Sequence, residues 1–324
     1  MITFKNVTKT FENGTEAIKG IDLHIKKGKL VVIIGPSGCG KTTTMKMINK
    51  LIHPTSGVIA IDGKDISGQK EVELRRSIGY VIQRIGLFPH MTIEENVALI
   101  PKLKGFKKEA YKEKVDELLK LVGLEPSLYK NRYPLELSGG QQQRVGVVRA
   151  LAGEPPIILM DEPFSALDPI SREQLQDELK LLQETIHKTI VFVTHDMDEA
   201  LKIADEIVVM KDGLIEQIAT PQELVQGPVN EFVRSFIGKE RIHAAINLQN
   251  PAEKEISMIM EPVKQHATGE LPSIESTTLI KDVAQQMIIQ STHSMYVVQN
   301  GERVGIVHKD GLLRELAGIV VEGA

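Results

Sequence analysis

A glycine-rich stretch near the N-terminus has the residue types and spacing of a phosphate-binding loop. Residues 35–42 match the pattern G-x-x-x-x-G-K-[ST]. Glycines allow backbone N–H groups to surround phosphate oxygens, because no Cβ stands in the way. The Lys41 ammonium can reach the β- and γ-phosphates, and the Thr42 hydroxyl suits Mg²⁺. The predicted nucleoside triphosphate contacts here are Gly35, Pro36, Ser37, Gly38, Cys39, Gly40, Lys41, Thr42 and Thr43.

Two adjacent carboxylates further along the chain could complete such a site. Asp161 ends the apolar run 157–160, so it can hold Mg²⁺ opposite Thr42. Glu162 can orient and deprotonate an attacking water, which predicts hydrolysis of the nucleotide rather than its storage.

Two more polar residues follow predicted strands. Gln83 comes after the run 78–82 and could bind the metal or its water. His195 comes after the run 189–193 and could hydrogen-bond the same phosphate. A histidine in such a place is more often structural, but its alignment with the earlier strand ends favours a catalytic role. The acidic residues just after it are expected to cap and solvate the start of a helix: Asp196, Asp198 and Glu199.

The elements that position these residues follow from the hydrophobic pattern. The apolar run 30–34 predicts a buried strand before the phosphate loop, and Met45, Ile48, Leu51 and Ile52 predict one face of a helix after it. These flanking elements disfavour the alternative of a chance glycine-rich turn. Strands that alternate with helices predict a mainly parallel α/β sheet, with the site at the carboxyl ends of the strands.

Composition limits the class of protein. The chain of 324 residues has a net charge of −4, which gives no reason to expect a nucleic-acid partner. Its one cysteine excludes an internal disulfide and fits a reducing compartment. We see no signal peptide and no apolar run of roughly 18–20 residues, so any membrane role is expected to depend on partner subunits.

The alternation of strands and helices weakens after residue 221, and a separate, smaller α/β pattern follows. We predict a nucleotide-binding domain over 1–240, a polar linker over 241–253 and a small α/β domain over 254–324. Residues 247–324 carry 10 acidic and 6 basic side chains, whereas the rest of the chain is balanced. The tail is expected to contain a helix over 278–290, strands over 295–298 and 303–307, and a helix over 311–316.

One further motif brings a family resemblance. Residues 137–141, Leu-Ser-Gly-Gly-Gln, followed by Gln-Gln-Arg, resemble the signature of ATP-binding cassette (ABC) ATPases. The order of phosphate loop, Gln83, signature, residues 159–163, residues 165–168 and His195 also matches that family. The resemblance implies a RecA-like core with an antiparallel β-subdomain and a helical subdomain. It also implies that two cassettes pair head to tail around ATP and Mg²⁺.

The resemblance assigns further roles. Phe11, which the pattern alone suggests is a core aromatic, resembles the residue that stacks on adenine. Gln83 resembles the residue that links Mg²⁺ and water to the transmembrane subunits, Glu162 the general base and His195 the γ-phosphate sensor. Asp168 belongs to the loop that crosses the dimer interface. The second anion cradle, which would hold the partner's ATP, consists of Ser138, Gly139, Gly140 and Gln141.

More narrowly, residues 81–92 and 228–233 resemble the ATPases of quaternary-amine osmoprotectant importers. That resemblance implies import of glycine betaine, carnitine, choline or proline betaine, with a permease and, indirectly, a substrate-binding protein as partners. It places the chain peripherally on the cytoplasmic face of the bacterial plasma membrane. Residues 256–317 are similar to one cystathionine-β-synthase (CBS) repeat, which usually comes in tandem but occurs once here.

Several alternatives remain open at this stage. The solute could be another small molecule, and a CBS-type nucleotide sensor with a non-cycling cassette is a second class. Cys39 is either a reactive thiolate or an inert filler. The loop 86–92 either meets the permease or folds back onto the helical subdomain. The tail is either a module that pairs with a second tail, which would bury Ile274, Met287, Val297, Ile306 and Leu313, or a remnant that only aids folding or dimerisation.

Overall fold

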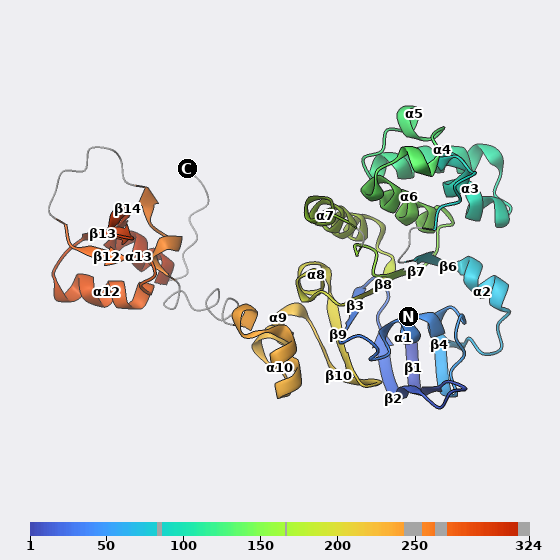
Figure 1. The fold of residues 1–324 in the computed structure, drawn as a ribbon, viewed down its shortest axis with the longest axis horizontal. Helices are drawn as coiled ribbons and strands as arrows, with labels where there is room; N and C mark the ends of the chain where they lie inside the picture. The colour runs from blue at the N-terminus through green and yellow to red at the C-terminus, as the bar shows by residue number, and fades with distance from the viewer. Residues whose placement is uncertain (83–85, 166, 243–254, 263–270, 317–324) are drawn as a thin grey trace. The chain divides into compact units, whose positions relative to one another are not determined.

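The computed structural model describes residues 1–82, 86–165, 167–242, 255–262 and 271–316 (Figure 1). The chain divides into two compact units, Met1–Phe236 and Ile237–Ala324, and each is described by itself. The predicted linker falls almost wholly outside the described residues, so its limits remain a prediction.

A six-stranded sheet forms the centre of the first unit, in the order β10-β9-β3-β8-β7-β6. All neighbouring strands are parallel except β10, which pairs antiparallel with β9. The predicted parallel sheet is therefore confirmed. The strands are β3 (Leu30–Ile34), β6 (Ile78–Val81), β7 (Ile157–Asp161), β8 (Thr189–Thr194), β9 (Glu206–Lys211) and β10 (Leu214–Ala219).

A second, antiparallel sheet has the order β2-β1-β4-β5. Its strands are β1 (Ile2–Thr10), β2 (Glu16–Ile25), β4 (Ser56–Ile61) and β5 (Lys64–Asp65). Helix α1 (Lys41–Ile48) shares one hydrophobic core with strands of both sheets, through Met45 and Ile48. Leu51 was predicted to continue the buried face of this helix, and that prediction is wrong. The helix ends at Ile48, the chain turns at Lys50 with a φ of 54°, and Leu51 is 47% exposed.

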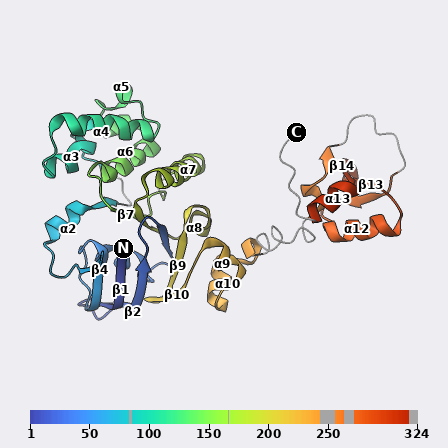
Figure 2. The same ribbon diagram turned by 180° about the vertical axis from the view of Figure 1, so that it is seen from behind.

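The helices α3, α4, α5 and α6 gather at one end of this unit, and strands β1, β2 and β4 lie at the other (Figures 1 and 2). A capping box begins α3, because the Thr92 and Glu95 side chains each bond the other's backbone N–H. These helices are α3 (Ile93–Leu103), α4 (Lys108–Leu121), α5 (Pro126–Tyr129) and α6 (Gly139–Ala152).

The remaining helices of this unit flank its sheets. They are α2 (Glu71–Ser77), α7 (Pro169–Ile186), α8 (Met197–Ile203), α9 (Pro221–Gln226) and α10 (Glu231–Ile237). Within the described part of the chain, none of the helices combines the length and apolar character needed to cross a membrane.

The described residues of the second unit form a four-stranded sheet in the order β11-β14-β13-β12, together with helices α12 and α13. The predicted strands and helices of the tail are present as β12 (Ser273–Glu275), α12 (Ile280–Ile289), β13 (Ser294–Gln299), β14 (Glu302–His308) and α13 (Lys309–Leu316), preceded by β11 (Glu261–Pro262). The likeness to a CBS repeat remains a prediction. The predicted pairing surface needs correction, because Ile274, Met287 and Val297 already lie in the unit's own core. Leu313 is 52% exposed.

Candidate active site

Three neighbouring parallel strands bring predicted site residues to one edge of the sheet. β3 leads into the phosphate loop, β8 into His195, and β7 ends at Asp161 with Glu162 next. Because these strands are adjacent and run in the same direction, their carboxyl ends meet. Gln83, predicted to follow β6, lies outside the described residues, so its role remains a prediction.

The phosphate loop is confined so tightly that glycine is required at its last turn. Gly40 has a φ of 104°, and a Cβ built there would lie 2.6 Å from Ile18 Cδ1 and 2.7 Å from the Ala17 carbonyl oxygen. The antiparallel sheet therefore supports the loop from one side. A side chain at Gly40 would displace the backbone that must approach a phosphate.

The lysine of the loop is buried and held by the loop itself. Lys41 Nζ donates to the carbonyl oxygens of Gly35 at 2.7 Å and Pro36 at 2.9 Å. Cys39 is only 3% exposed, and burial raises the pKa of its thiol despite the neighbouring Lys41 charge. This environment disfavours a thiolate, so Cys39 fits the inert filler of the two alternatives.

A hydroxyl and a carboxylate meet where a metal ion would bind. Thr42 Oγ1 donates to Asp161 Oδ1 at 3.0 Å, and burial raises the pKa of that carboxyl. Among the described residues, no group of three or more His, Cys, Asp or Glu side chains could hold a metal. Two oxygen ligands fit Mg²⁺, which keeps several waters and binds through few protein ligands plus substrate phosphates.

Glu162 and His195 come together as predicted from the ends of neighbouring strands. His195 Nδ1 lies 3.3 Å from Glu162 Oε1. Glu162 has a left-handed backbone conformation with a φ of 43°, and its N–H donates to the Val193 carbonyl oxygen. The Ser165 hydroxyl donates to the Glu162 carbonyl oxygen at 2.9 Å. The turn is therefore fixed by the neighbouring strand β8 and by the loop that follows Glu162.

The signature residues lie at the start of α6 and face solvent. Ser138 caps the helix by accepting from the Gln141 N–H, and the Gln141 side chain accepts from the Ser138 N–H in return. A Cβ built on Gly139 would meet nothing within 4 Å. The exposed helix start can therefore receive an anion brought by another molecule.

Two other predicted contacts also lie at the surface. Phe11 is 37% exposed, with Lys9 Nζ 5.1 Å from its ring centroid, so the core interpretation of this residue is wrong. Asp168 is exposed directly before α7, and its carbonyl oxygen accepts from the Arg172 N–H. Ala166, in the same loop, lies outside the described residues.

Comparison with known proteins assigns the family. A family model described as "ABC transporter" matches residues 18–165. The choline transport ATP-binding protein OpuBA of Bacillus subtilis is 54% identical, over 94% of this chain and 77% of that protein. This chain belongs to the ABC transporter ATPases. The glycine betaine/carnitine/choline transport ATP-binding protein OpuCA of Bacillus subtilis is 51% identical to this ABC ATPase, over 97% of the chain and 87% of that protein.

A solved structure resembles the nucleotide-binding unit of this ABC ATPase. It is a dimeric, post-hydrolysis ATP-binding cassette bound to ADP and Pi, with 41% identity and a TM-score of 0.62. The match covers 68% of this chain and 99% of that one. The fold, the use of ATP with Mg²⁺ and hydrolysis coupled to transport are therefore those of the family.

Sequence reasoning missed one charged residue of this ABC ATPase. Glu199 was expected to be solvated, but it is only 6% exposed, and its Oε2 accepts from Thr194 Oγ1 at 2.6 Å. Burial raises the pKa of Glu199. Its spacing four residues before Ile203, which is buried on the same face of α8, was the available signal.

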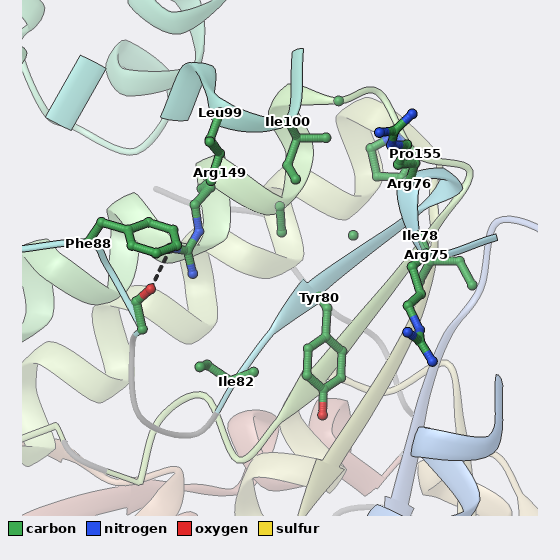
Figure 3. Close-up of a pocket in the computed structure, with 14 residues that line it drawn as sticks. Arg75, Arg76, Ile78, Tyr80, Ile82, Phe88, Leu99, Ile100, Arg149 and Pro155 are labelled. Carbon is green, nitrogen blue, oxygen red and sulfur yellow. Dashed lines mark hydrogen bonds between the residues drawn. The ribbon is translucent and has the colours of Figure 1, made fainter. Parts of the chain in front are cut away.

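A groove of about 310 Å³ lies between the sheet and the helical subdomain of this ABC ATPase (Figure 3). Tyr80 and Ile82 line it from the end of the sheet, Leu99 from α3 and Phe88 from the loop 86–92. The Arg149 guanidinium donates to the Gly86 carbonyl oxygen at 2.7 Å, and burial lowers the pKa of Arg149. The other lining residues are Arg75, Arg76, Ile78, Gly79, Ile100, Ala150, Gly153 and Pro155.

Proposed function

We propose that this ABC ATPase drives an importer of quaternary-amine osmoprotectants such as choline, glycine betaine and carnitine. The observation that carries the proposal is that the similar proteins are named for the transport of such solutes. Proteins at 50–54% identity over almost the whole chain are named for transport of these solutes. The cassette itself does not select the solute, so the proposal concerns the permease with which it assembles.

The site residues divide the work of hydrolysis. The loop around Gly40 surrounds the phosphates, and Lys41 carries the positive charge that faces them. Thr42, Asp161 and Gln83 would hold Mg²⁺, which neutralises phosphate charge when bound. Glu162 orients the attacking water and accepts its proton, and the exposed ring of Phe11 stacks on adenine.

His195 and a second copy of the chain complete this arrangement. His195 hydrogen-bonds the γ-phosphate and keeps the Glu162 carboxylate directed at the water. The signature residues Ser138, Gly139 and Gly140 present an open helix start to the ATP of the partner cassette. Solved relatives that form dimers support this head-to-tail pairing.

The groove of Figure 3 is the docking site that we propose for the permease. Phe88 is 41% exposed at its rim. The loop backbone is held independently, because the Asn96 side chain bonds the Phe88 N–H and carbonyl oxygen and the Met91 carbonyl oxygen. The loop is thus rigid while its apolar side chains remain available to a partner helix. The ATPase would then lie peripherally on the cytoplasmic face of the membrane.

A docking test compares two exposed phenylalanines of the same domain. Phe88→Asp, together with Leu87→Asp, should abolish co-purification with the permease and leave basal ATP hydrolysis intact. Phe106→Asp is the matched control, since Phe106 is 36% exposed and does not line the groove. Loss of hydrolysis or folding in Phe88→Asp would instead favour a loop that supports the helical subdomain.

The solute is tested in cells that contain the ATPase and its permease. Labelled choline, glycine betaine and carnitine should be imported by the parent and not by Glu162→Gln. Unlabelled quaternary amines should compete, whereas inorganic ions should not. Competition by phosphate or iron alone would assign the chain to another importer and contradict the proposal.

A further inference from the structure

Arg172, near the start of α7, contacts both the loop before that helix and the turn that carries His195. Its Nη2 donates to the Leu167 carbonyl oxygen at 3.2 Å. Its Nη1 lies 3.9 Å from Asp196 Oδ2, and its Nε lies 3.9 Å from Glu199 Oε1. One guanidinium therefore connects the loop to two carboxylates that follow His195.

Those two carboxylates fix the backbone on both sides of His195. Asp196 Oδ1 accepts from the N–H groups of Asp198 at 2.9 Å and Glu199 at 3.4 Å. Glu199 Oε2 accepts from Thr194 Oγ1, which in turn accepts from the Asp196 N–H at 3.0 Å. A displacement of either carboxylate therefore changes the direction of the imidazole.

Arg172 and Glu199 line the same small cavity, of about 60 Å³, as the catalytic pair Glu162 and His195. Its lining consists of Glu162, Ser165, Arg172, Thr194, His195, Asp196 and Glu199. Arg172 Nε is buried and, within the described part of the chain, has no hydrogen-bond partner. The guanidinium thus faces Asp196 and Glu199 and offsets the repulsion between them.

We propose that Arg172 is a positioning residue for His195. It couples the loop that ends at Asp168 to the turn after β8, and so to the γ-phosphate contact. This inference rests on the proposed function, in which that loop meets the second cassette. Pairing of two chains then orients the imidazole through Arg172, which coordinates hydrolysis with assembly. The alternative is an ion pair that only holds α7 against α8.

The test measures steady-state ATP hydrolysis by the full-length protein against ATP concentration. Arg172→Gln should lower kcat about 10- to 100-fold, because small misplacements of a catalytic group have effects of that size. KM for ATP should stay within about threefold, since Arg172 does not touch the phosphate loop. The Hill coefficient should fall toward one. Arg172→Lys should restore the Tm but not kcat, because an ammonium lacks the planar fork that reaches Leu167 and both carboxylates.

A double-mutant cycle and a control separate positioning from support of the fold. Glu199→Gln should also lower kcat, and the double variant should be no slower than Arg172→Gln alone, because both act in one network. Lys202→Gln removes a 2.8 Å ion pair with Asp177 across the same two helices. Its kcat should stay within about twofold of the parent, as expected for a partly exposed pair.

The inference is overturned by full rescue of kcat in Arg172→Lys, by additive losses in the cycle, or by an unchanged Hill coefficient in Arg172→Gln. If Arg172→Gln does not fold, Arg172→Lys replaces it in the cycle with Glu199→Gln, and full kcat in Arg172→Lys or additive losses in that cycle overturn the inference. A parent that hydrolyses ATP without cooperativity would overturn the paired-site proposal together with this inference. A cooperative parent with an unaffected Arg172→Gln overturns this inference alone.

Discussion

The chain contains two anion cradles that differ in how they are completed. The phosphate loop is finished by folding, with Gly40 packed against Ile18 and Ala17 and with Lys41 bonded to the loop carbonyls. The signature is held by the Ser138–Gln141 capping box at the start of α6 and by a hydrogen bond from the Gln141 amide to the Tyr129 hydroxyl. Ser138 and Gly139 remain exposed, with open space around Gly139. Folding supplies one half of the site, and assembly supplies the other half.

Because of this difference, a defect in each cradle should be detected by a different measurement. A defect in the phosphate loop should appear in a single chain, as lost stability and lost ATP binding. A defect in the signature should appear only when two chains meet. Each prediction below tests that separation, and they are ordered from the largest expected effect on hydrolysis to the smallest.

Glu162→Gln should lower turnover by about 10²–10⁴-fold, the usual contribution of a general base. ATP affinity should persist, because the phosphate loop and Lys41 are unchanged. An ATP-bound dimer should accumulate, since ATP that is not hydrolysed keeps both cradles occupied. Size-exclusion chromatography with and without ATP measures this. A Glu162→Gln protein that remains monomeric and active would remove the argument for a composite site.

Gly40→Ala should abolish ATP binding by the single chain and also destabilise it. The new Cβ meets Ile18 and the Ala17 carbonyl in a left-handed backbone region. Overpacking of this kind costs about 1–3 kcal/mol in the free energy of unfolding. Thermal unfolding and fluorescent-nucleotide binding are the measurements. Gly63→Ala is the control for backbone conformation alone, because Gly63 lies outside the phosphate loop and its φ is also positive, but a Cβ there meets nothing within 4 Å.

Gly139→Ala should leave the Tm unchanged or slightly higher, because alanine is the better helix former and has room here. ATP binding by the single chain should also be normal. Turnover should fall, and in a Glu162→Gln background the ATP-dependent dimer should weaken, because the methyl group stands where the partner's phosphate arrives. Weaker ATP binding by the monomer would mean that the two cradles are not separate.

Deletion of residues 247–324 should have the smallest effect on hydrolysis, because neither cradle contains a tail residue. Basal ATPase activity should remain within about twofold, in line with a unit that has its own core. Transport assays at several salt and nucleotide concentrations then test regulation by the tail. A flattened response identifies a regulator, whereas an unchanged response with intact assembly identifies a remnant.

The sequence predicted the site well where position along a strand determines position in space. Asp161, Glu162 and His195 each follow an apolar run, and parallel strands bring such ends together without further information. The pattern failed where local signals compete with tertiary packing. Leu51 continues the helical periodicity, but the chain turns at Lys50, which has a positive φ.

The sequence also could not predict which titratable side chains are buried. Glu199 has the position of a solvated first-turn acid, yet it lies inward against Thr194 and Arg172. Cys39 follows a glycine in an anion loop, yet packing raises the pKa of its thiol. Both outcomes depend on neighbours from distant segments, such as Met210 near the loop, that no local pattern identifies.

The left-handed conformation of Glu162 resolves a problem of direction for the two adjacent acids. In an extended strand, consecutive side chains point to opposite faces, so Asp161 and Glu162 could not both serve one phosphate. The reversal at Glu162 lets the first carboxylate meet Thr42 and the second meet His195. The left-handed backbone at Glu162 costs about 1–3 kcal/mol of strain, and this cost arises once, when the chain folds. Each round of hydrolysis then begins with both acids already aimed, and no backbone rotation stands between ATP binding and the attack of water.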